Sequence, residues 1–312
     1  MSGPAVAIID IGSNSIKVLV AARAEAGGLK TLLSKSLDVR ISAGISASEP
    51  RLSDEGIDRG LAAVQELLTL AAPYSPVLAT LVATSAVRDA VNGNEFRSKI
   101  LAATGFDVRI LTGEQEARAI GRGLISDPAL TNLENYYVFD LGGGSLECLA
   151  FKDRNMEQAI SLQLGCVRLT EKFVADPSAI FTTETRSAIK DHVRTALIAS
   201  GFRFDLRYAA AVATGGTVTT VRTILGKRAG WTLEQTPALV TVRQLSQLLD
   251  GFSSLSLTQR QEIPGMPAAR ADVFPTALVT ILALAEIGGF TSFCHSLHNL
   301  RYGLAMELLE SL

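Results

Sequence analysis

The stretch VFDLGGGS, Val138–Ser145, decides the fold class, because a strand-like apolar run ends in an aspartate and then breaks into three glycines and a serine. The stretch AIIDIGSNS, Ala7–Ser15, has the same skeleton of an apolar run, Asp, an apolar residue, Gly and Ser. A second apolar segment follows each stretch, so each predicts a β-hairpin with a glycine turn. We interpret the two copies as an internal duplication, with one hairpin opening each half of the chain.

The composition is that of a globular protein with a sizeable core. The chain has 312 residues, of which 47% are hydrophobic and 19% charged, and its formal net charge is −2. At roughly 100–200 residues per domain, this length predicts two domains. The charged fraction argues against disorder, and the net charge provides no general basic field for nucleic acid or a membrane surface. We therefore expect neither nucleic acid nor a membrane as a partner.

The cysteines and the apolar segments predict a cytoplasmic protein. Cys148, Cys166 and Cys294 are odd in number and lack metal-ligand spacing, which is typical of buried thiols in a reducing compartment. Asp10 interrupts the first apolar run, so the N-terminus does not have the pattern of a secretory signal. The most apolar late segment, Val273–Ala285, is too short to cross a bilayer and predicts a buried helix.

Local signals place the functional candidates on particular elements. Val77–Ala83 predicts a buried strand, which a Thr-Ser loop and a helix start with Arg88 follow. Thr112 and Gln115 predict a capping box, and this fixes a helix start with Glu116 in its first turn. Such an acidic residue is also favoured there by the helix dipole alone, and Arg88 alone would be an ordinary surface residue.

The strand-into-glycine pattern occurs a third time at Gly215-Gly216-Thr217. Glycines allow backbone N–H groups to converge, and converging N–H groups bind anions such as phosphate. Hydroxyl groups at Ser13, Ser15, Ser145 and Thr217 add donors, and an aspartate just before such a turn can hold Mg²⁺. Ordinary turn geometry is the alternative explanation for one copy. Three copies favour phosphate binding.

Six motifs occur in the order found in one protein family: AIIDIGSNSIKVLV, ATSAVRDA, LTGEQEAR, VFDLGGGSLE, LGCVRLTEKF and ATGGTVTTV. The chain thus resembles the Ppx/GppA family of exopolyphosphatases and guanosine pentaphosphate phosphohydrolases, within the actin-like ATPase superfamily. The resemblance implies an α/β fold of two ribonuclease-H-like domains with a cleft between them, each a mixed five-stranded sheet with flanking helices. We expect the domains to span residues 1–126 and 127–312. The closing helix, expected over residues 296–312 and amphipathic, is the element that could pack back on the first domain.

The resemblance also implies roles for individual residues. Glu116 matches the family's catalytic glutamate, Arg88 its phosphate-contacting arginine, and Asp140 and Glu147 its acidic pair for metal and water. The expected phosphate-binding residues are Gly12, Ser13, Asn14, Ser15, Gly142, Gly143, Gly144, Ser145, Gly215, Gly216 and Thr217. The expected metal ligands are Asp140, Glu147 and Asp10, with Mg²⁺ as the cofactor and Mn²⁺ as an alternative.

Two positions depart from the family pattern. Gln115 stands at the first acidic position of the Gly-x-Glu-Glu-Ala-Arg motif, and Leu146 replaces a hydroxyl residue, which removes one phosphate donor.

Other charged residues are weaker candidates. Arg118, Arg168 and Arg270 could contact phosphate, although we expect solvated charges at all three. His295 and His298 could share a helix face, but a histidine pair without a third ligand is more often structural.

These observations predict a metal-dependent exopolyphosphatase that releases orthophosphate from the end of polyphosphate. A hydrolase that removes the terminal phosphate of pppGpp is the close alternative, because both substrates end in a phosphoanhydride. A sugar or carboxylate kinase of the same superfamily and a non-catalytic sensor of polyphosphate or alarmone are the other readings. The family resemblance alone implies a homodimer.

Overall fold

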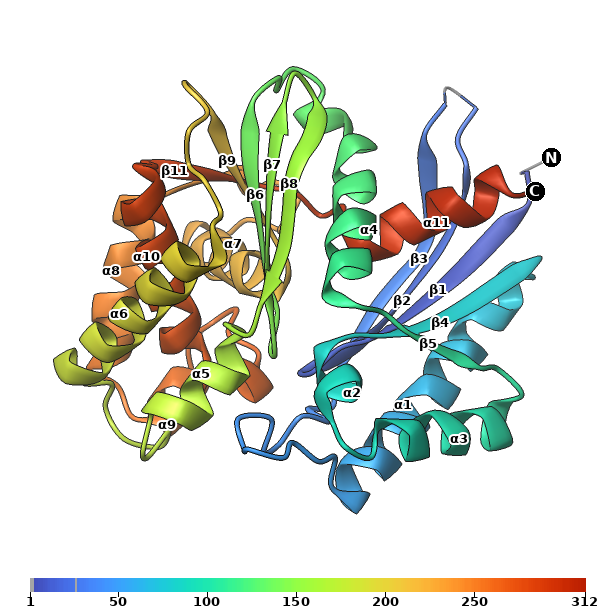
Figure 1. The fold of residues 1–312 in the computed structure, drawn as a ribbon, viewed down its shortest axis with the longest axis horizontal. Helices are drawn as coiled ribbons and strands as arrows, with labels where there is room; N and C mark the ends of the chain where they lie inside the picture. Colours follow the sequence, from blue (N-terminus) through green and yellow to red (C-terminus); the bar gives the residue numbers. More distant parts are fainter. Residues whose placement is uncertain (1–2, 26) are drawn as a thin grey trace. The chain divides into compact units, whose positions relative to one another are not determined.

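The structure is a computed structural model that describes residues 3–25 and 27–312. Residue contacts divide the chain into two compact units. Unit 1 comprises Met1–Thr131 together with His298–Leu312, and unit 2 comprises Asn132–Leu297. Each unit is built on one mixed β-sheet with flanking helices (Figure 1), which confirms the predicted α/β class.

The sheet of unit 1 has five strands in the order β3-β2-β1-β4-β5. Its strands are β1 (Ala5–Ile11), β2 (Ser15–Arg23), β3 (Leu29–Asp38), β4 (Leu78–Ala83) and β5 (Val108–Ile110). The predicted hairpin is β1 and β2, which pair antiparallel, whereas β4 lies parallel to β1. Every residue of β1 is buried, as expected for the central strand of a sheet that is covered on both faces.

The helices of unit 1 lie on both faces of this sheet. They are α1 (Asp54–Ala71), α2 (Ser85–Asp89), α3 (Gly93–Thr104), α4 (Gly113–Ile125) and α11 (Leu300–Glu310), with short 3₁₀ turns at Ala72–Tyr74 and Pro128–Leu130. Figure 1 shows α1 and α3 on one face and α4 and α11 on the other. The predicted capping box at the start of α4 is confirmed, because Thr112 and Gln115 exchange side-chain and backbone hydrogen bonds.

The sheet of unit 2 repeats this arrangement. Its strands are β6 (Tyr136–Leu141), β7 (Leu146–Lys152), β8 (Asn155–Leu162), β9 (Ala210–Thr214), β10 (Leu239–Thr241) and β11 (Ser292–His295), in the order β10-β11-β9-β6-β7-β8. The hairpin β6–β7 is again antiparallel, and β9 lies parallel to β6 as β4 lies parallel to β1. The shared topology supports the internal duplication.

Unit 2 differs from the expected five strands by the additional strand β10. This strand has three residues and pairs antiparallel with β11 at the edge of the sheet. It leads directly into a capped helix, α8, so the chain lies along the sheet edge before the helix begins.

The helices of unit 2 include one apolar helix, α10. They are α5 (Cys166–Phe173), α6 (Thr183–Ser200), α7 (Gly216–Ala229), α8 (Val242–Ser253), α9 (Leu257–Gln261) and α10 (Phe274–Gly288), with a 3₁₀ turn at Ala268–Arg270. Helix α10 contacts α5, α6, α7 and α8 and is buried along most of its length. The prediction of a buried helix after residue 272 is thus confirmed. No helix in the described residues is long and apolar enough for a transmembrane span.

The closing helix α11 packs within unit 1, on α4, β1 and β2. The close approach of α11 and α4 requires Gly303, because a Cβ there would overlap the carbonyl of Ala119. The prediction of an amphipathic helix from residue 296 was wrong in two respects. The helix begins at Leu300, and residues on all its sides are buried because it lies between the sheet and α4.

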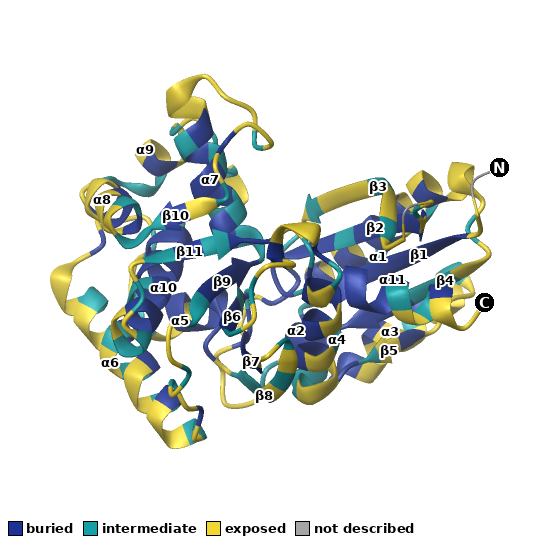
Figure 2. Cartoon of the chain, turned by 90° about the horizontal axis from the view of Figure 1, so that it is seen from above, coloured by how far each residue is buried: buried dark blue, intermediate teal, exposed yellow. Residues whose placement is uncertain are grey.

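The central strands of both sheets are buried and the outer faces of the helices are exposed (Figure 2). Glycine turns follow the two central strands β1 and β6, so the candidate residues lie at the carboxyl ends of these strands. In open α/β sheets, ligands bind outside the carboxyl ends of the strands. The fold therefore places the candidates where this architecture binds ligands.

Candidate active site

The first glycine turn joins β1 to β2 in unit 1. The amide of Gly12 donates to the carbonyl of Ser15 at 3.2 Å, and this bond closes the turn. Ser13, Asn14 and Ser15 are all buried. Asp10, which precedes the turn, is 8% exposed, and its cross-strand partner on β2 is Lys17. Because directly opposed residues share one face of a sheet, the Asp10 carboxylate has a cation as its neighbour.

Side chains hold the first turn from two directions. The hydroxyl oxygens of Ser13 and Ser85 are 3.0 Å apart, which ties the turn to the start of α2. Arg40 donates from Nε to Asn14 Oδ1 at 3.0 Å. The Nδ2 atom of Asn14 is buried without a hydrogen-bond partner among the described residues. Buried polar groups are normally satisfied, so this amide is a donor that a bound anion could use.

An arginine–glutamate pair lies beside the first turn in unit 1. Arg88 is in the last turn of α2, and its Nη1 donates to Glu116 Oε2 at 2.8 Å and to the Leu111 carbonyl at 3.1 Å. Glu116 is in the first turn of α4 and is 6% exposed. Strand β4 leads into α2, and the Thr84 amide donates to the Ile11 carbonyl at the end of β1. Unit 1 therefore holds a fixed, nearly buried carboxylate on the same sheet end as the turn.

The second glycine turn joins β6 to β7 in unit 2 and repeats the bond of the first. The Gly142 amide donates to the Ser145 carbonyl at 3.0 Å. The N-terminus of α5 lies against this turn, and the amides of Cys166 and Val167 donate to the carbonyls of Gly142 and Gly143. A Cβ at Gly165 would overlap the backbone of the turn, so only glycine permits this contact.

Two backbone amides of the second turn, unlike its carbonyls, have no hydrogen-bond partner among the described residues. Within the described residues, the structure shows no hydrogen bond from the backbone amides of Gly143 or Gly144. Arg168 donates from Nε to the Gly144 carbonyl at 3.0 Å and is 8% exposed. The carbonyls are therefore occupied from one side, while two amides stay available to an anion.

Two carboxylates are neighbours at the second turn. Asp140 and Glu147 are directly opposed on β6 and β7, so their side chains share one face of the sheet. Ser161 donates from Oγ to Glu147 Oε1 at 2.7 Å, and Glu147 is 2% exposed. The carboxylate of Asp140 lies against Gly215, where a Cβ would be 2.5 Å from Oδ1.

The third glycine turn precedes α7 and lies beside this acidic pair. Gly215 has a φ of 91°, which a side chain would strain, and it is the N-cap residue of α7. Thr217 is buried in the first turn of the helix. A Cβ at Gly216 would overlap the guanidinium of Arg270, so this cation lies over the helix N-terminus. Both features favour an anion at this turn.

The three arginines and two histidines that the sequence offered as weaker candidates lie in different surroundings. Arg118 is an exposed charge that pairs with Glu114 at 2.9 Å, as predicted. The prediction was wrong for Arg168, which is buried against Gly144. Arg270 is half-buried, and its guanidinium lies against Gly216. The position of Arg168 in the motif LGCVRLTEKF was the one sequence signal for its role. His295 lies in β11, and His298 precedes α11, so they do not share a helix face.

The acidic pair fits a divalent cation that is held together with a phosphate. Mg²⁺ commonly binds one or two carboxylates and completes its shell with substrate oxygens and water. Asp140 and Glu147 provide two such carboxylates. Among the described residues, no group of three or more His, Cys, Asp or Glu side chains could hold a metal ion alone. Asp10 adds one carboxylate in unit 1, where its neighbour is Lys17.

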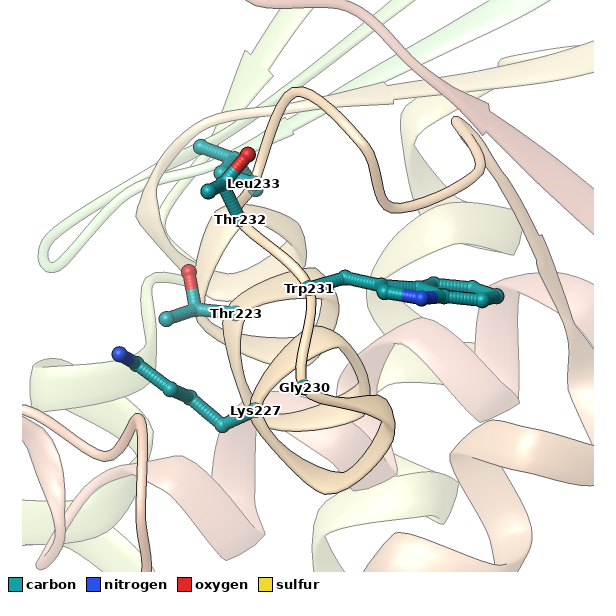
Figure 3. Close-up of a pocket in the computed structure, with 6 residues that line it drawn as sticks. All are labelled: Thr223, Lys227, Gly230, Trp231, Thr232 and Leu233. Carbon is teal, nitrogen blue, oxygen red and sulfur yellow. The ribbon is translucent and has the colours of Figure 1, made fainter.

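A cavity of about 410 Å³ lies at the opposite end of α7. Its lining residues are Thr223, Lys227, Gly230, Trp231, Thr232 and Leu233, from the end of the helix and the loop after it (Figure 3). Thr223, the lining residue nearest to the glycine turn along the helix, lies about 10 Å from Gly216 at a rise of about 1.5 Å per residue. The cavity is therefore not part of the phosphate-binding turns.

Comparison with known proteins decides the family. The sequence model of the Ppx/GppA phosphatase family matches residues 19–312. The chain belongs to this family. Family members hydrolyse phosphoanhydrides, and the chain shares that activity at the level of the family. The predicted family and the predicted two-domain fold are thus confirmed.

Solved structures of Ppx/GppA proteins align with nearly the whole chain. An exopolyphosphatase from Cytophaga hutchinsonii is 21% identical, with a TM-score of 0.88 over 99% of this chain and 98% of that chain. An Aquifex aeolicus member of the family is 26% identical, with a TM-score of 0.78 over 99% and 98% of the two chains. An exopolyphosphatase-like protein is 25% identical, with a TM-score of 0.87 over 99% and 98%.

Proposed function

We propose that this Ppx/GppA protein is an exopolyphosphatase, which hydrolyses the terminal phosphoanhydride of inorganic polyphosphate and releases orthophosphate. The observation that carries the proposal is the pair of Glu116 and Arg88, a nearly buried carboxylate fixed by a guanidinium at 2.8 Å. A general base must be held in a defined position to act on water, and this contact defines it.

Glu116 would act as the general base. The oxygen of a water molecule attacks the terminal phosphorus, its proton passes to Glu116, and the bond from that phosphorus to the bridging oxygen breaks. The bridging oxygen leaves on the shortened polyphosphate, so atoms and charge balance. Arg88 would hold the carboxylate and place a positive charge beside the transferred phosphoryl group. Phosphoryl transfer needs such positioning and charge neutralisation more than covalent chemistry.

The glycine turns would bind the phosphate chain. In unit 2, the backbone amides of Gly143 and Gly144 and the Arg270 guanidinium support this assignment, and in unit 1 the buried Asn14 Nδ2 supports it. Asp140 and Glu147 would hold Mg²⁺, whose charge, when bound, reduces the repulsion between the phosphates and the attacking oxygen.

A phosphate-release assay tests the proposal. Short polyphosphate, long polyphosphate, pppGpp and ATP are compared with the wild-type protein in the presence of Mg²⁺. We expect the highest kcat/KM on polyphosphate. A higher kcat/KM on pppGpp would assign the alternative hydrolase activity, and release from none of the four would overturn the proposed function.

The variant Glu116→Gln tests the base. We expect phosphate release to fall by about 10²–10⁴-fold while polyphosphate still binds. Glu114→Gln is the matched control, because Glu114 lies in the same helical turn and its side chain is 68% exposed. Near-wild-type turnover of Glu116→Gln would remove this residue from the role of base.

A further inference from the structure

A line of hydrogen bonds connects an arginine in the interior of unit 2 to the third glycine turn. Arg222 Nη1 and His295 Nδ1 are 2.9 Å apart, His295 Nε2 and Thr219 Oγ1 are 3.2 Å apart, and Thr219 Oγ1 donates to the Gly215 carbonyl at 2.9 Å. Arg222 and His295 are buried. The line joins α7 to β11, elements that are far apart in the sequence.

The chemistry of the groups fixes the direction of every bond. A guanidinium has donors only, so His295 Nδ1 must accept from Arg222. The imidazole is then the neutral tautomer with its proton on Nε2, and it donates to Thr219 Oγ1. The threonine hydroxyl proton is therefore directed to the Gly215 carbonyl. His295 and Thr219 thus each accept one hydrogen bond and donate the next, from Arg222 at one end to the Gly215 carbonyl at the other.

The histidine distinguishes Thr219 from the other threonines of α7. The hydroxyl of Thr223 donates to the Thr219 carbonyl at 2.8 Å, and that of Thr220 donates to the Gly216 carbonyl at 2.8 Å. Such bonds to the residue four positions earlier are ordinary in helices. Thr219 makes the same bond, but its hydroxyl is also oriented by a side chain from another strand.

The far end of the line is anchored in the loop after α7. Arg222 donates to the carbonyls of Leu233, Thr236 and Pro237, which holds this loop and leaves the guanidinium one orientation. Figure 3 shows Trp231 and Leu233 in the loop. His295 is thus held by a rigid donor and cannot rotate freely.

At the near end, Gly215 has little room to move. Its φ is 91° and the carboxylate of Asp140 lies against its Cα. A displacement of Gly215 would therefore move both the amides of the third turn and the neighbouring acidic side chain.

We propose that Thr219 and His295 are positioning residues, which hold the Gly215–Thr217 turn in the conformation that binds the phosphate chain. This inference rests on the proposed function, because that function supplies the phosphate chain as the ligand. The two residues act through Gly215 and do not contact the reacting atoms.

Two pairs of variants separate positioning from packing. Thr219→Val removes the hydroxyl and keeps the branched shape, whereas Thr219→Ser restores the hydroxyl. His295→Asn keeps an acceptor for Arg222 but loses the donor to Thr219, whereas His295→Gln restores a donor at the position of Nε2. Thr223→Val is the matched control, because it removes an ordinary helix hydroxyl one turn further along α7.

We expect Thr219→Val and His295→Asn to raise the KM for polyphosphate by about 3- to 10-fold, the worth of one hydrogen bond. The kcat should stay within about twofold, since the base and the reacting phosphate are untouched. Hydrogen exchange of the amides of residues 215–218 should accelerate in the same two variants. The Ser and Gln variants and Thr223→Val should resemble the wild type in both measurements.

Wild-type KM and wild-type exchange in Thr219→Val and His295→Asn would overturn the positioning role. An equal effect of Thr223→Val would also overturn it, because the bond would then be ordinary helix packing. The exchange measurement and calorimetric binding of tripolyphosphate need no turnover. They test the positioning role even if the wild type releases no phosphate, a result that would count against the proposed function alone.

Discussion

The first and second glycine turns have the same backbone hydrogen bond but differ in the charged residues that flank them. Each follows the central strand of its sheet, and each is closed by a bond from the first glycine amide to the serine carbonyl, at 3.2 Å in unit 1 and 3.0 Å in unit 2. In unit 1, Asp10 is opposed by Lys17, whereas in unit 2 Asp140 is opposed by Glu147. The opposite charges of Asp10 and Lys17 neutralise each other, whereas the two carboxylates of unit 2 together attract a cation.

The two turns also differ in what supports them. A serine–serine contact ties the turn of unit 1 to α2. In unit 2, backbone amides of α5 bind the turn carbonyls, and Gly165 allows the helix to approach. The two copies of the hairpin therefore share their turn geometry but differ in their cross-strand residues and in the elements that support them. We infer a division of work, with the base in unit 1 and the cation ligands in unit 2.

The largest expected effect is a loss of stability when the contact between the start of α5 and the second turn is disturbed. Gly165→Ala should destabilise unit 2 by more than about 3 kcal/mol, because the new methyl group overlaps backbone atoms that cannot rotate away. Urea unfolding monitored by circular dichroism measures this change. Gly251→Ala is the control, since that glycine lies in α8 with open space around it, and alanine there should stabilise slightly. Equal stability of the two variants would contradict this account of the support.

The next prediction concerns the cation. Glu147→Gln should raise the Mg²⁺ concentration for half-maximal phosphate release by at least about 10-fold, because one of two adjacent carboxylates loses its charge. Titration of Mg²⁺ against activity and against the melting temperature provides two independent readings. Lys17→Gln, at the corresponding position of unit 1, should leave the Mg²⁺ requirement unchanged. A shift in Lys17→Gln as large as in Glu147→Gln would remove the proposed division of work.

A smaller effect, on the free energy of unfolding, should have opposite signs for substitutions in the two units. Like charges directly opposed on neighbouring strands destabilise by about 0.2–1 kcal/mol. Without metal, Asp140→Asn should therefore stabilise the protein by about that amount, and Asp10→Asn should destabilise it. Thermal unfolding in a metal chelator measures both variants. The same sign for both substitutions would show that the cross-strand charges do not distinguish the turns.

The smallest expected effect concerns the chain segment that returns to unit 1. Burial lowers the pKa of His298, with Asp127 and the Gly123 backbone acting in the opposite direction, and the ring stacks on Tyr302 in α11. The unfolded chain therefore binds a proton more readily than the folded chain. Stability should fall as the pH is lowered from above the ordinary histidine pKa of about 6.5 towards the lower folded value.

His298→Gln should flatten this part of the stability profile between pH 7 and pH 5. The melting temperature, followed across that range for the wild type and the variant, is the measurement. Parallel profiles would exclude His298 as the source of the pH dependence.

The sequence alone determined the local features. An aspartate, a glycine and a serine at fixed spacing specify a hairpin turn, and Thr112 with Gln115 specifies where α4 begins, because neighbouring residues satisfy these requirements. The order of the motifs was sufficient for the family. The tertiary structure decided what depends on residues far apart: the placement of α11 on α4, the burial of Arg168 against Gly144, and the contact of His295 with Thr219. Such contacts arise from the packing of whole elements, and no local pattern encodes which distant partner a side chain will meet.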